Sequence, residues 1–264
     1  MLPRLITIGN FFLPTYGVCV ALGFLVGMWI ATREARRRGL NPEAISNLAV
    51  YCALAGLAGA KLMMIALDFD TFVRHPARLF SVDTLLSAGV FHGGFLAAVL
   101  VLVVYIRRQR LPGWSVADCL VPGLALGHAI GRLGCFAAGC CWGTRCDRPW
   151  AVTFTNPDAH AITGVPLDIP LHPTQLYESF GTFVVFGLLM WRARRAHAPG
   201  TILAWYLVSY SLVRLVTESY REHQEALPFG GPLTWTQWIA VLLAVVGAAF
   251  LTLRRTAPRK RSDV

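Results

Sequence analysis

Long apolar runs alternate with short polar segments along this chain, and seven of the runs approach the length of a membrane-crossing helix. A helix needs about 20 residues to cross a hydrocarbon core about 30 Å thick. The seven runs lie at roughly residues 13–32, 47–67, 87–106, 116–136, 174–191, 201–219 and 235–253. This pattern predicts an all-α integral membrane protein with about seven transmembrane helices, forming a single membrane domain over residues 1–264.

The composition agrees with a membrane protein, because 55% of the 264 residues are hydrophobic and only 14% are charged. The net charge of +10 does not indicate a nucleic-acid partner, since the cations stand in short clusters between the apolar runs. The N-terminal stretch "MLPRLITIGNFFLPTYG" contains no small-residue cleavage site. We therefore expect the first segment to be retained rather than removed as a signal peptide.

The distribution of the cations predicts the orientation of the chain. The loops after spans one, three and five and the C-terminal tail hold fifteen of them: Arg33, Arg36, Arg37, Arg38, Arg107, Arg108, Arg110, Arg192, Arg194, Arg195, Arg254, Arg255, Arg259, Lys260 and Arg261. The opposite side holds six: Arg4, Arg74, Arg78, Arg145, Arg148 and Arg221. The positive-inside rule then places the N-terminus outside and the C-terminus in the cytosol.

The longest connection, residues 137–173 between spans four and five, falls on the extracytoplasmic side in this orientation. Its stretch "WAVTFT" is typical of a short strand, and its prolines and glycines indicate turns. We expect it to form a small extracytoplasmic cap.

Three cations, Lys61, Arg132 and Arg214, lie within the predicted spans. Placing such a charge at the centre of a membrane helix costs about 2.5–3.5 kcal/mol on insertion scales, so these residues are expected to face a partner or a cavity. Small residues precede both Lys61 and Arg132, which favours close approach of neighbouring helices.

Span six carries Tyr210, Arg214 and Glu218 at intervals of four residues, which places them on one helix face. Two interpretations remain open. Glu218 forms an ion pair with Arg214 or Arg132 that only locks helices together, or the two arginines bind an anion.

Further polar side chains occur near the same predicted end of the spans. His92 opens span three and is followed by Gly93 and Gly94, which leave room for a ligand or for a close helix. In span five Gln175, Tyr177 and Glu178 are too polar to face lipid and should point inward. Together the following residues predict a site that binds a phosphate through two guanidiniums and moves a proton through an imidazole: His92, Arg132, Tyr177, Glu178, Tyr210, Arg214 and Glu218.

Six ordered segments then show a resemblance to a known family, the prolipoprotein diacylglyceryl transferases. They are "YGVCVALGFLVG" from Tyr16, "GAKL" from Gly59, "HGGF" from His92, "ADCLVPGLALGHAIGRLG" from Ala117, "HPTQLYE" from His172 and "YSLVRLVTESYRE" from Tyr210. The resemblance implies an enzyme of the bacterial inner membrane that transfers the diacylglyceryl group of phosphatidylglycerol to the lipobox cysteine of a prolipoprotein. It implies a thioether product, release of glycerol phosphate, a prolipoprotein signal peptide as partner, and no metal or other cofactor.

The resemblance also implies roles for single residues. Arg132 and Arg214 would bind the lipid phosphate and stabilise the departing glycerol phosphate, and His92 would be the base for the substrate thiol. The residues expected to bind substrate are Tyr16, Lys61, Gly93, Gly94, Cys135, Cys140, Tyr177, Glu178, Tyr210 and Glu218. The chain departs from the family where Cys135 and Cys140 stand at positions that usually carry an asparagine and an acidic residue.

Four cysteines lie at the outer end of span four: Cys135, Cys140, Cys141 and Cys146. One or two disulfides that pin the cap to the span are the favoured interpretation, since the outer compartment is oxidising. Adjacent Cys140 and Cys141 would be strained if bonded to each other, which favours pairing with Cys135 or Cys146. The spacing is not a usual zinc pattern, but a metal site, a redox role and free thiols remain alternatives.

Two other functions remain open from the sequence. One is a membrane thiol oxidoreductase that uses the outer cysteines. The other is a lipid-binding or transport protein that has the scaffold of the transferases without their activity.

Overall fold

The computed structural model describes residues 2–8, 11–81, 84, 89–222, 228 and 231–256. The chain divides into two compact units, one formed by Met1–Ala31 and Ala117–Val264 and the other by Thr32–Val116. Arg259, Lys260 and Arg261, which support the predicted orientation, lie outside the described residues. The single membrane domain over residues 1–264 stays a prediction.

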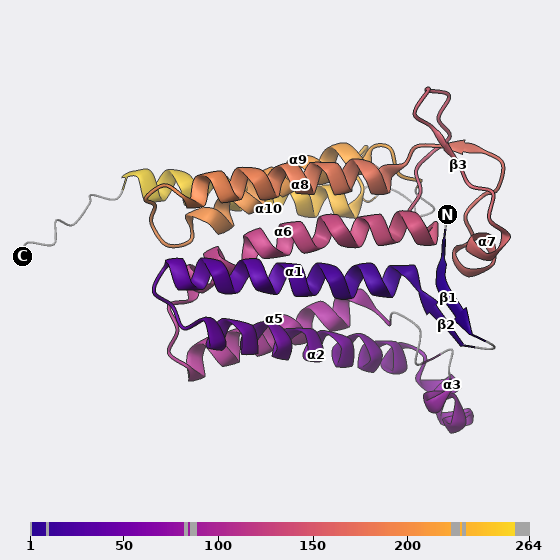
Figure 1. The fold of residues 1–264 in the computed structure, drawn as a ribbon, viewed down its shortest axis with the longest axis horizontal. Coiled ribbons are helices and arrows are strands. Elements are labelled where there is room, and N and C mark those ends of the chain that lie inside the picture. Colours follow the sequence, from indigo (N-terminus) through magenta and orange to yellow (C-terminus); the bar gives the residue numbers. More distant parts are fainter. Residues whose placement is uncertain are drawn as a thin grey trace, which may run out of the picture. The chain divides into compact units, whose positions relative to one another are not determined.

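The first unit begins with a β-hairpin and continues with helices (Figure 1). Strands β1 (Arg4–Ile8) and β2 (Phe11–Pro14) pair in antiparallel register and lead directly into α1 (Thr15–Arg37). The other helices are α6 (Gly113–Ala138), α7 (Pro157–Thr163), α8 (Thr174–Ala193), α9 (Thr201–Glu218) and α10 (Trp235–Thr256). The hairpin was not predicted, because its strands are short and adjoin the longer apolar run that dominates the hydropathy pattern.

The second unit is built on two long helices, α2 (Pro42–Leu67) and α5 (Phe91–Arg108), with α3 (Phe69–Arg74) and the 3-10 helix η1 (Pro76–Phe80) between them in the chain. Glycines bring α2 and α5 into contact: a Cβ placed on Gly94 would lie 2.7 Å from the carbonyl oxygen of Gly56. The backbone N–H of Val90 also donates to the carbonyl of Ala60 at 3.0 Å. Small residues therefore set the distance between these helices.

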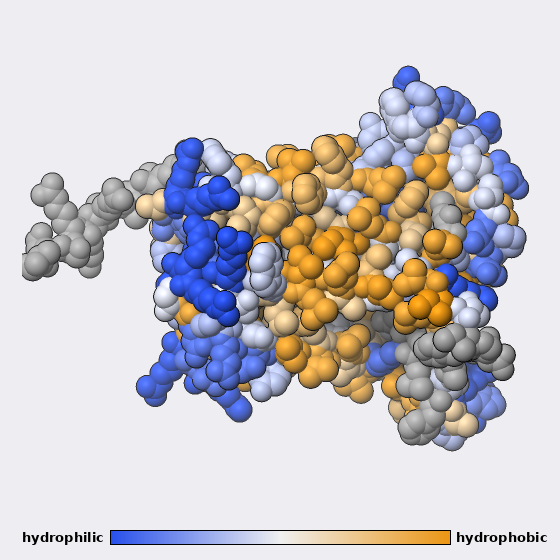
Figure 2. Space-filling model, viewed as in Figure 1, coloured by the Kyte–Doolittle hydropathy of each residue, from blue (hydrophilic) through white to orange (hydrophobic). Residues whose placement is uncertain are grey.

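Each of the seven predicted spans coincides with a long helix, within several residues at the ends. Five of these helices, α1, α2, α5, α6 and α10, are long and apolar enough to cross a membrane. Figure 2 shows hydrophobic residues over the middle parts of the helices and hydrophilic residues toward their ends. Large side chains such as Leu57, Leu100 and Leu242 are more than 60% exposed, as expected of surfaces that face lipid. The prediction of a mainly helical, multi-pass membrane protein is confirmed, and the number of seven spans stays a prediction.

Glycines also determine how α1 packs against α6 within the first unit. A Cβ on Gly127 would lie 2.8 Å from the carbonyl oxygen of Gly23, and a Cβ on Gly23 would lie 2.7 Å from the carbonyl oxygen of Gly127. Because backbone faces backbone here, no side chain can rotate to make room. This contact fixes α6, the helix that carries Arg132.

A buried carboxylate positions the start of α9. Asp118 in α6 is fully buried and accepts hydrogen bonds from the N–H groups of Gly200 and Leu203, at 2.8 and 2.9 Å. The first N–H groups of a helix have no partner inside the helix, so an acceptor at this position stabilises it. Asp118 thereby ties α9 to α6 at the end of α9 opposite Arg214.

Residues beyond α6 fold over a small core of their own. Strands β3 (Val152–Thr153) and β4 (Pro170–Leu171) pair in antiparallel register, so the short strand predicted in "WAVTFT" is present. Phe154, Ala159 and Val165 are fully buried in this core. The extracytoplasmic location of this segment, residues 137–173, stays a prediction.

The glycine contact between α1 and α6 predicts that Gly127→Ala destabilises the protein. Overpacking a close contact costs about 1–3 kcal/mol, so the detergent-solubilised variant should melt at a lower temperature. Gly187→Ala is the matched control, because a Cβ at that α8 position has no atom within 4 Å. Equal melting temperatures for the two variants would contradict the assigned role of Gly127.

Candidate functional site

The side chain of Glu178, near the start of α8, is the centre of a buried polar cluster in the first unit. It is 2% exposed, and its Oε2 atom lies 2.7 Å from Nη2 of Arg132 and 3.1 Å from Nη1 of Arg214. Arg132 comes from α6 and Arg214 from α9, so one carboxylate joins three helices. The structure therefore brings together both arginines that the sequence singled out, and it adds the group that holds them.

Two further side chains contact the other oxygen of the same carboxylate. The hydroxyl of Tyr210 donates to Oε1 of Glu178 at 3.1 Å, and Nε2 of His128 lies 3.3 Å from it. The His128 ring packs against Tyr210 with ring centres 5.3 Å apart. Both oxygens of Glu178 are thus occupied, which fixes the orientation of the carboxylate.

Glu218 extends the cluster along α9. Its Oε2 atom lies 2.7 Å from Nη2 of Arg214, as the spacing of four residues predicted, and 3.8 Å from Nη1 of Arg221. Arg221 was counted only among the loop cations, although its spacing of three residues from Glu218 was the signal that could have placed it here. The open question of Glu218's partner is thereby answered in favour of Arg214.

The two predicted tyrosines outside α9 lie apart from the carboxylate. Tyr177 forms a 3.0 Å hydrogen bond with Nδ1 of His172, and its ring lies edge-on to Tyr220. Tyr16 at the start of α1 is 40% exposed and lies against Gly134 of α6, where a Cβ would lie 3.3 Å from the Tyr16 Cα atom. Glycine at position 134 thus allows Tyr16 to stand beside the helix turn that follows Arg132.

Four of the residues that the sequence predicted for the site belong to the second unit. Lys61 donates from Nζ to the backbone carbonyl of Thr84. The side chain of His92 is exposed, and its ring lies edge-on to Phe91 with ring centres 5.9 Å apart. Gly93 and Gly94 face the backbone of α2, so the space beside them is filled by the close helix rather than left for a ligand.

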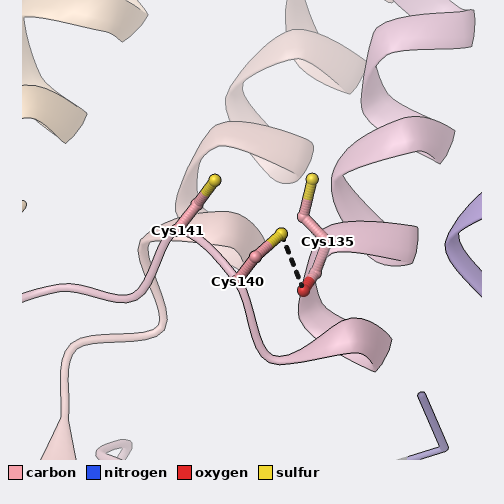
Figure 3. A group of neighbouring side chains, drawn as sticks. All are labelled: Cys135, Cys140 and Cys141. Atoms are coloured by element: carbon pink, nitrogen blue, oxygen red, sulfur yellow. Dashed lines mark hydrogen bonds between the residues drawn. The ribbon is translucent and has the colours of Figure 1, made fainter. Parts of the chain in front are cut away.

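The outer cysteines separate into a group of three and a single residue. The sulfur atoms of Cys135, Cys140 and Cys141 all lie within 4.8 Å of one another, and Figure 3 shows the three side chains gathered at the end of α6. Cys146 is buried in the segment beyond, where its N–H donates to the carbonyl of Pro170. All the cysteines are free thiols in this structure. The disulfides that were expected among these four residues stay a prediction.

Thr174 and Gln175, at the start of α8, hold the backbone that carries these thiols. Oγ1 of Thr174 donates to the carbonyl of Cys141 at 2.8 Å, and Nε2 of Gln175 donates to the carbonyl of Cys140 at 2.6 Å. Sequence reasoning identified Gln175 only as an inward-pointing polar residue. Its partner is a backbone group in a loop, and a loop conformation has no signal in hydropathy.

The cluster around Glu178, with Arg132 and Arg214, is suited to binding an anion. Arginine presents a planar fork of five N–H donors that matches carboxylate and phosphate oxygens, and both forks are already oriented by Glu178. The fold and the site therefore define a helical integral membrane protein in which a buried carboxylate holds two arginines together.

Comparison with known proteins makes the assignment more specific. The family model described as prolipoprotein diacylglyceryl transferase matches residues 3–253, and the chain belongs to this family. Relatives named phosphatidylglycerol-prolipoprotein diacylglyceryl transferase include one from Synechococcus elongatus, 32% identical over 267 residues, which cover 97% of this chain and 90% of the relative. Another, from Mannheimia succiniciproducens, is 32% identical over 270 residues, covering 99% of this chain and 95% of the relative. One from Clostridium tetani is 29% identical over 242 residues, covering 91% and 92%. The resemblance stated from the sequence is confirmed.

The buried position of Glu178 predicts that Glu178→Gln strongly destabilises the protein. Removing one partner of a buried ion pair costs about 3–5 kcal/mol, because the remaining charges lose their counter-charge. Thermal unfolding of the detergent-solubilised protein measures this loss.

Asp147→Asn is the control, because Asp147 pairs with Arg145 at 3.7 Å with both side chains more than 70% exposed. Exposed pairs contribute about 0–1 kcal/mol, so this variant should melt close to the unchanged protein. If Glu178→Gln melted no lower than Asp147→Asn, the carboxylate would not be the group that holds the arginines.

Proposed function

We propose that this protein transfers the diacylglyceryl group of phosphatidylglycerol to the lipobox cysteine thiol of prolipoproteins. The thiol sulfur forms a bond to the glycerol carbon, the bond between that carbon and the phosphate oxygen breaks, and glycerol phosphate leaves. The product is a thioether. Membership of the family and the names of the relatives support this reaction.

The single observation that carries the proposal is the convergence of Arg132 and Arg214 on Glu178. A pair of arginines with no carboxylate between them would repel each other in a buried site. With Glu178 in place both guanidiniums are held close together before substrate arrives. Each has five N–H donors, more than the contacts with the carboxylates use, so donors remain for phosphate oxygens.

The charge of the cluster also suits a lipid phosphate. Arg132, Arg214 and Arg221 bring three positive charges, and Glu178 and Glu218 bring two negative ones. One positive charge remains, which equals in size the single negative charge of a phosphodiester. Binding phosphatidylglycerol would leave this site neutral, which is the favourable state for a group of charges removed from water.

The same arginines would act on the reaction itself. When the carbon–oxygen bond breaks, glycerol phosphate gains a second negative charge. Fixed donors aimed at a developing charge stabilise the transition state more than the ground state, because they need no reorganisation. Arg132 and Arg214 are the donors in this proposal.

The remaining roles follow from the family resemblance. His92 would accept the proton of the substrate thiol, whose ordinary pKa of about 8.5 leaves little thiolate at neutral pH. Tyr16, Tyr210 and Glu218 would shape the lipid site, with Lys61 and Tyr177 as further substrate-binding positions. Cys135 and Cys140 would border the arginine site, since Nη1 of Arg132 lies 4.0 Å from the sulfur of Cys135.

The membrane arrangement is part of the proposal. All seven long helices would cross the bacterial inner membrane, including α8 and α9, whose polar side chains Gln175, Glu178 and Glu218 are buried within the unit. The N-terminus would be outside and the C-terminus in the cytosol, in agreement with the distribution of the cations. Residues 137–173 would then cap the site on the side where prolipoproteins are modified.

If Arg214 binds the lipid phosphate, Arg214→Lys should reduce transfer about 100- to 1000-fold even though the positive charge is kept. Lysine lacks the planar fork of donors that lets arginine bind a carboxylate and a phosphate at once. Arg132→Ala should reduce transfer at least as much. The measurement is the mass of a reporter lipoprotein in cells depleted of their own transferase.

Arg145→Ala is the control, since this arginine is 74% exposed and pairs only loosely with Asp147. It should support lipidation like the unchanged protein. Full lipidation by Arg214→Lys would rule out the arginine fork as the phosphate-binding group.

If His92 accepts the proton of the substrate thiol, His92→Ala should lower the transfer rate at pH 7 about 100- to 10,000-fold. The loss should become smaller as the pH rises past about 8.5, because the substrate thiol then ionises without a base. Rates measured with purified protein over this pH range test it. His75→Ala, an exposed histidine of the same unit, is the control. A deficit that stays constant with pH would exclude His92 as the base.

A further inference from the structure

Three thiols at the end of α6 form a compact group that the proposed reaction does not use. The sulfur atoms of Cys135, Cys140 and Cys141 lie within 4.8 Å of one another. Cys135 is buried, whereas Cys140 and Cys141 are partly exposed. Figure 3 shows the three sulfur atoms on the same side of the chain, with Cys140 between the other two.

The backbone turns sharply to bring these residues together. Helix α6 ends at Ala138, and Gly139 follows with a φ of 79°, a left-handed conformation that glycine adopts readily. The N–H of Cys140 then donates to the carbonyl of Cys135 at 3.1 Å, which closes the turn. Cys141 itself has a φ of 60°, which is unfavourable for a residue with a side chain. The turn explains how cysteines with an unusual spacing in the sequence converge.

Helix α8 holds this turn from the other side. The hydroxyl of Thr174 binds the carbonyl of Cys141, and the amide of Gln175 binds the carbonyl of Cys140. Thr174 and Gln175 are 2% and 1% exposed, so both donors are fixed by packing. Sites whose ligands are held by such neighbours bind metal ions in a defined geometry.

The separation of the sulfur atoms suits coordination of a metal. Zinc binds thiolate sulfur at about 2.3 Å, so two sulfur ligands of one tetrahedral ion lie about 3.8 Å apart. Small side-chain rotations would bring sulfur atoms within 4.8 Å to that distance. A disulfide requires about 2.05 Å between two sulfur atoms and would leave the third thiol out. A metal ion engages all three.

A cation lies beside the three thiols. Nη1 of Arg132 lies 4.0 Å from the sulfur of Cys135. Three thiolates around a divalent cation carry one net negative charge, which is attracted to the guanidinium of Arg132.

We propose that Cys135, Cys140 and Cys141 bind one Zn²⁺ ion. Thiolates select zinc and other thiophilic cations over Mg²⁺ and Ca²⁺, which prefer oxygen. Three protein ligands leave one position of a tetrahedral ion to water or to an external ligand. This metal site goes beyond the proposed transferase function and does not depend on it.

The test uses the full-length protein, purified in detergent under reducing conditions without chelators. Its zinc content is measured by mass spectrometry of the metal, and the stripped protein is titrated with Co²⁺, whose thiolate complexes have characteristic charge-transfer absorption. We expect one ion per protein and a thiolate–cobalt band that Zn²⁺ displaces. Neither measurement involves the transfer reaction, so failure of the metal site and failure of the proposed function are distinguishable.

Variants identify the ligands. Cys135→Ser and Cys141→Ser should each reduce the affinity for Zn²⁺ at least tenfold, whereas Cys119→Ser and Cys146→Ser, which alter cysteines outside the group, should leave it unchanged. In the unchanged protein, which avoids any folding defect, Zn²⁺ should slow alkylation of the three thiols.

Three results would overturn the proposal. One is the absence of a thiolate–cobalt band from reduced, folded protein whose three thiols react freely with an alkylating reagent. Another is a Zn²⁺ affinity that Cys135→Ser and Cys141→Ser leave unchanged. The third is a disulfide between two of these cysteines in protein isolated from membranes without reductant.

Discussion

A carboxylate buried between two guanidiniums organises the first unit. Moving an unpaired charge out of water costs several kcal/mol, so Arg132, Arg214 and Glu178 are stable in place only together. Each belongs to a different helix, and the ion pairs at 2.7 and 3.1 Å tolerate little displacement. The positions of α6, α8 and α9 are therefore interdependent, and a change at any of these three residues destabilises the packing of all three helices.

Contacts far from the cluster position the helices that carry these three charged residues. The glycine contact with α1 sets the position of α6, and Asp118 ties the start of α9 to α6. The turn after α6 then depends on α8, through the hydrogen bonds of Thr174 and Gln175. One helix end thus carries both the arginine cluster and the three thiols, and Nη1 of Arg132 lies 4.0 Å from the sulfur of Cys135.

Hydropathy predicted the helices well, because a span must be long, apolar and nearly free of charge. The same rule made Arg132, Arg214 and Glu218 conspicuous, and the spacing of four residues predicted the pair between Arg214 and Glu218. The hairpin at the N-terminus was missed, since short apolar strands resemble the beginning of a span. The partners of Gln175 and Arg221 were missed because both depend on loops beyond the helix ends.

The sequence alone determined the membrane class and the helix boundaries to within several residues, because both follow from local pattern and spacing. Its resemblance to known proteins indicated the family, and the charges within apolar spans singled out Arg132 and Arg214. Only the tertiary structure decided that Glu178 joins the two arginines, that Gly93 and Gly94 serve a close helix, and that three of the four outer cysteines converge. Such partnerships join residues distant in the chain. They depend on helix packing and on the direction of a turn, and neither can be read from hydropathy or residue spacing.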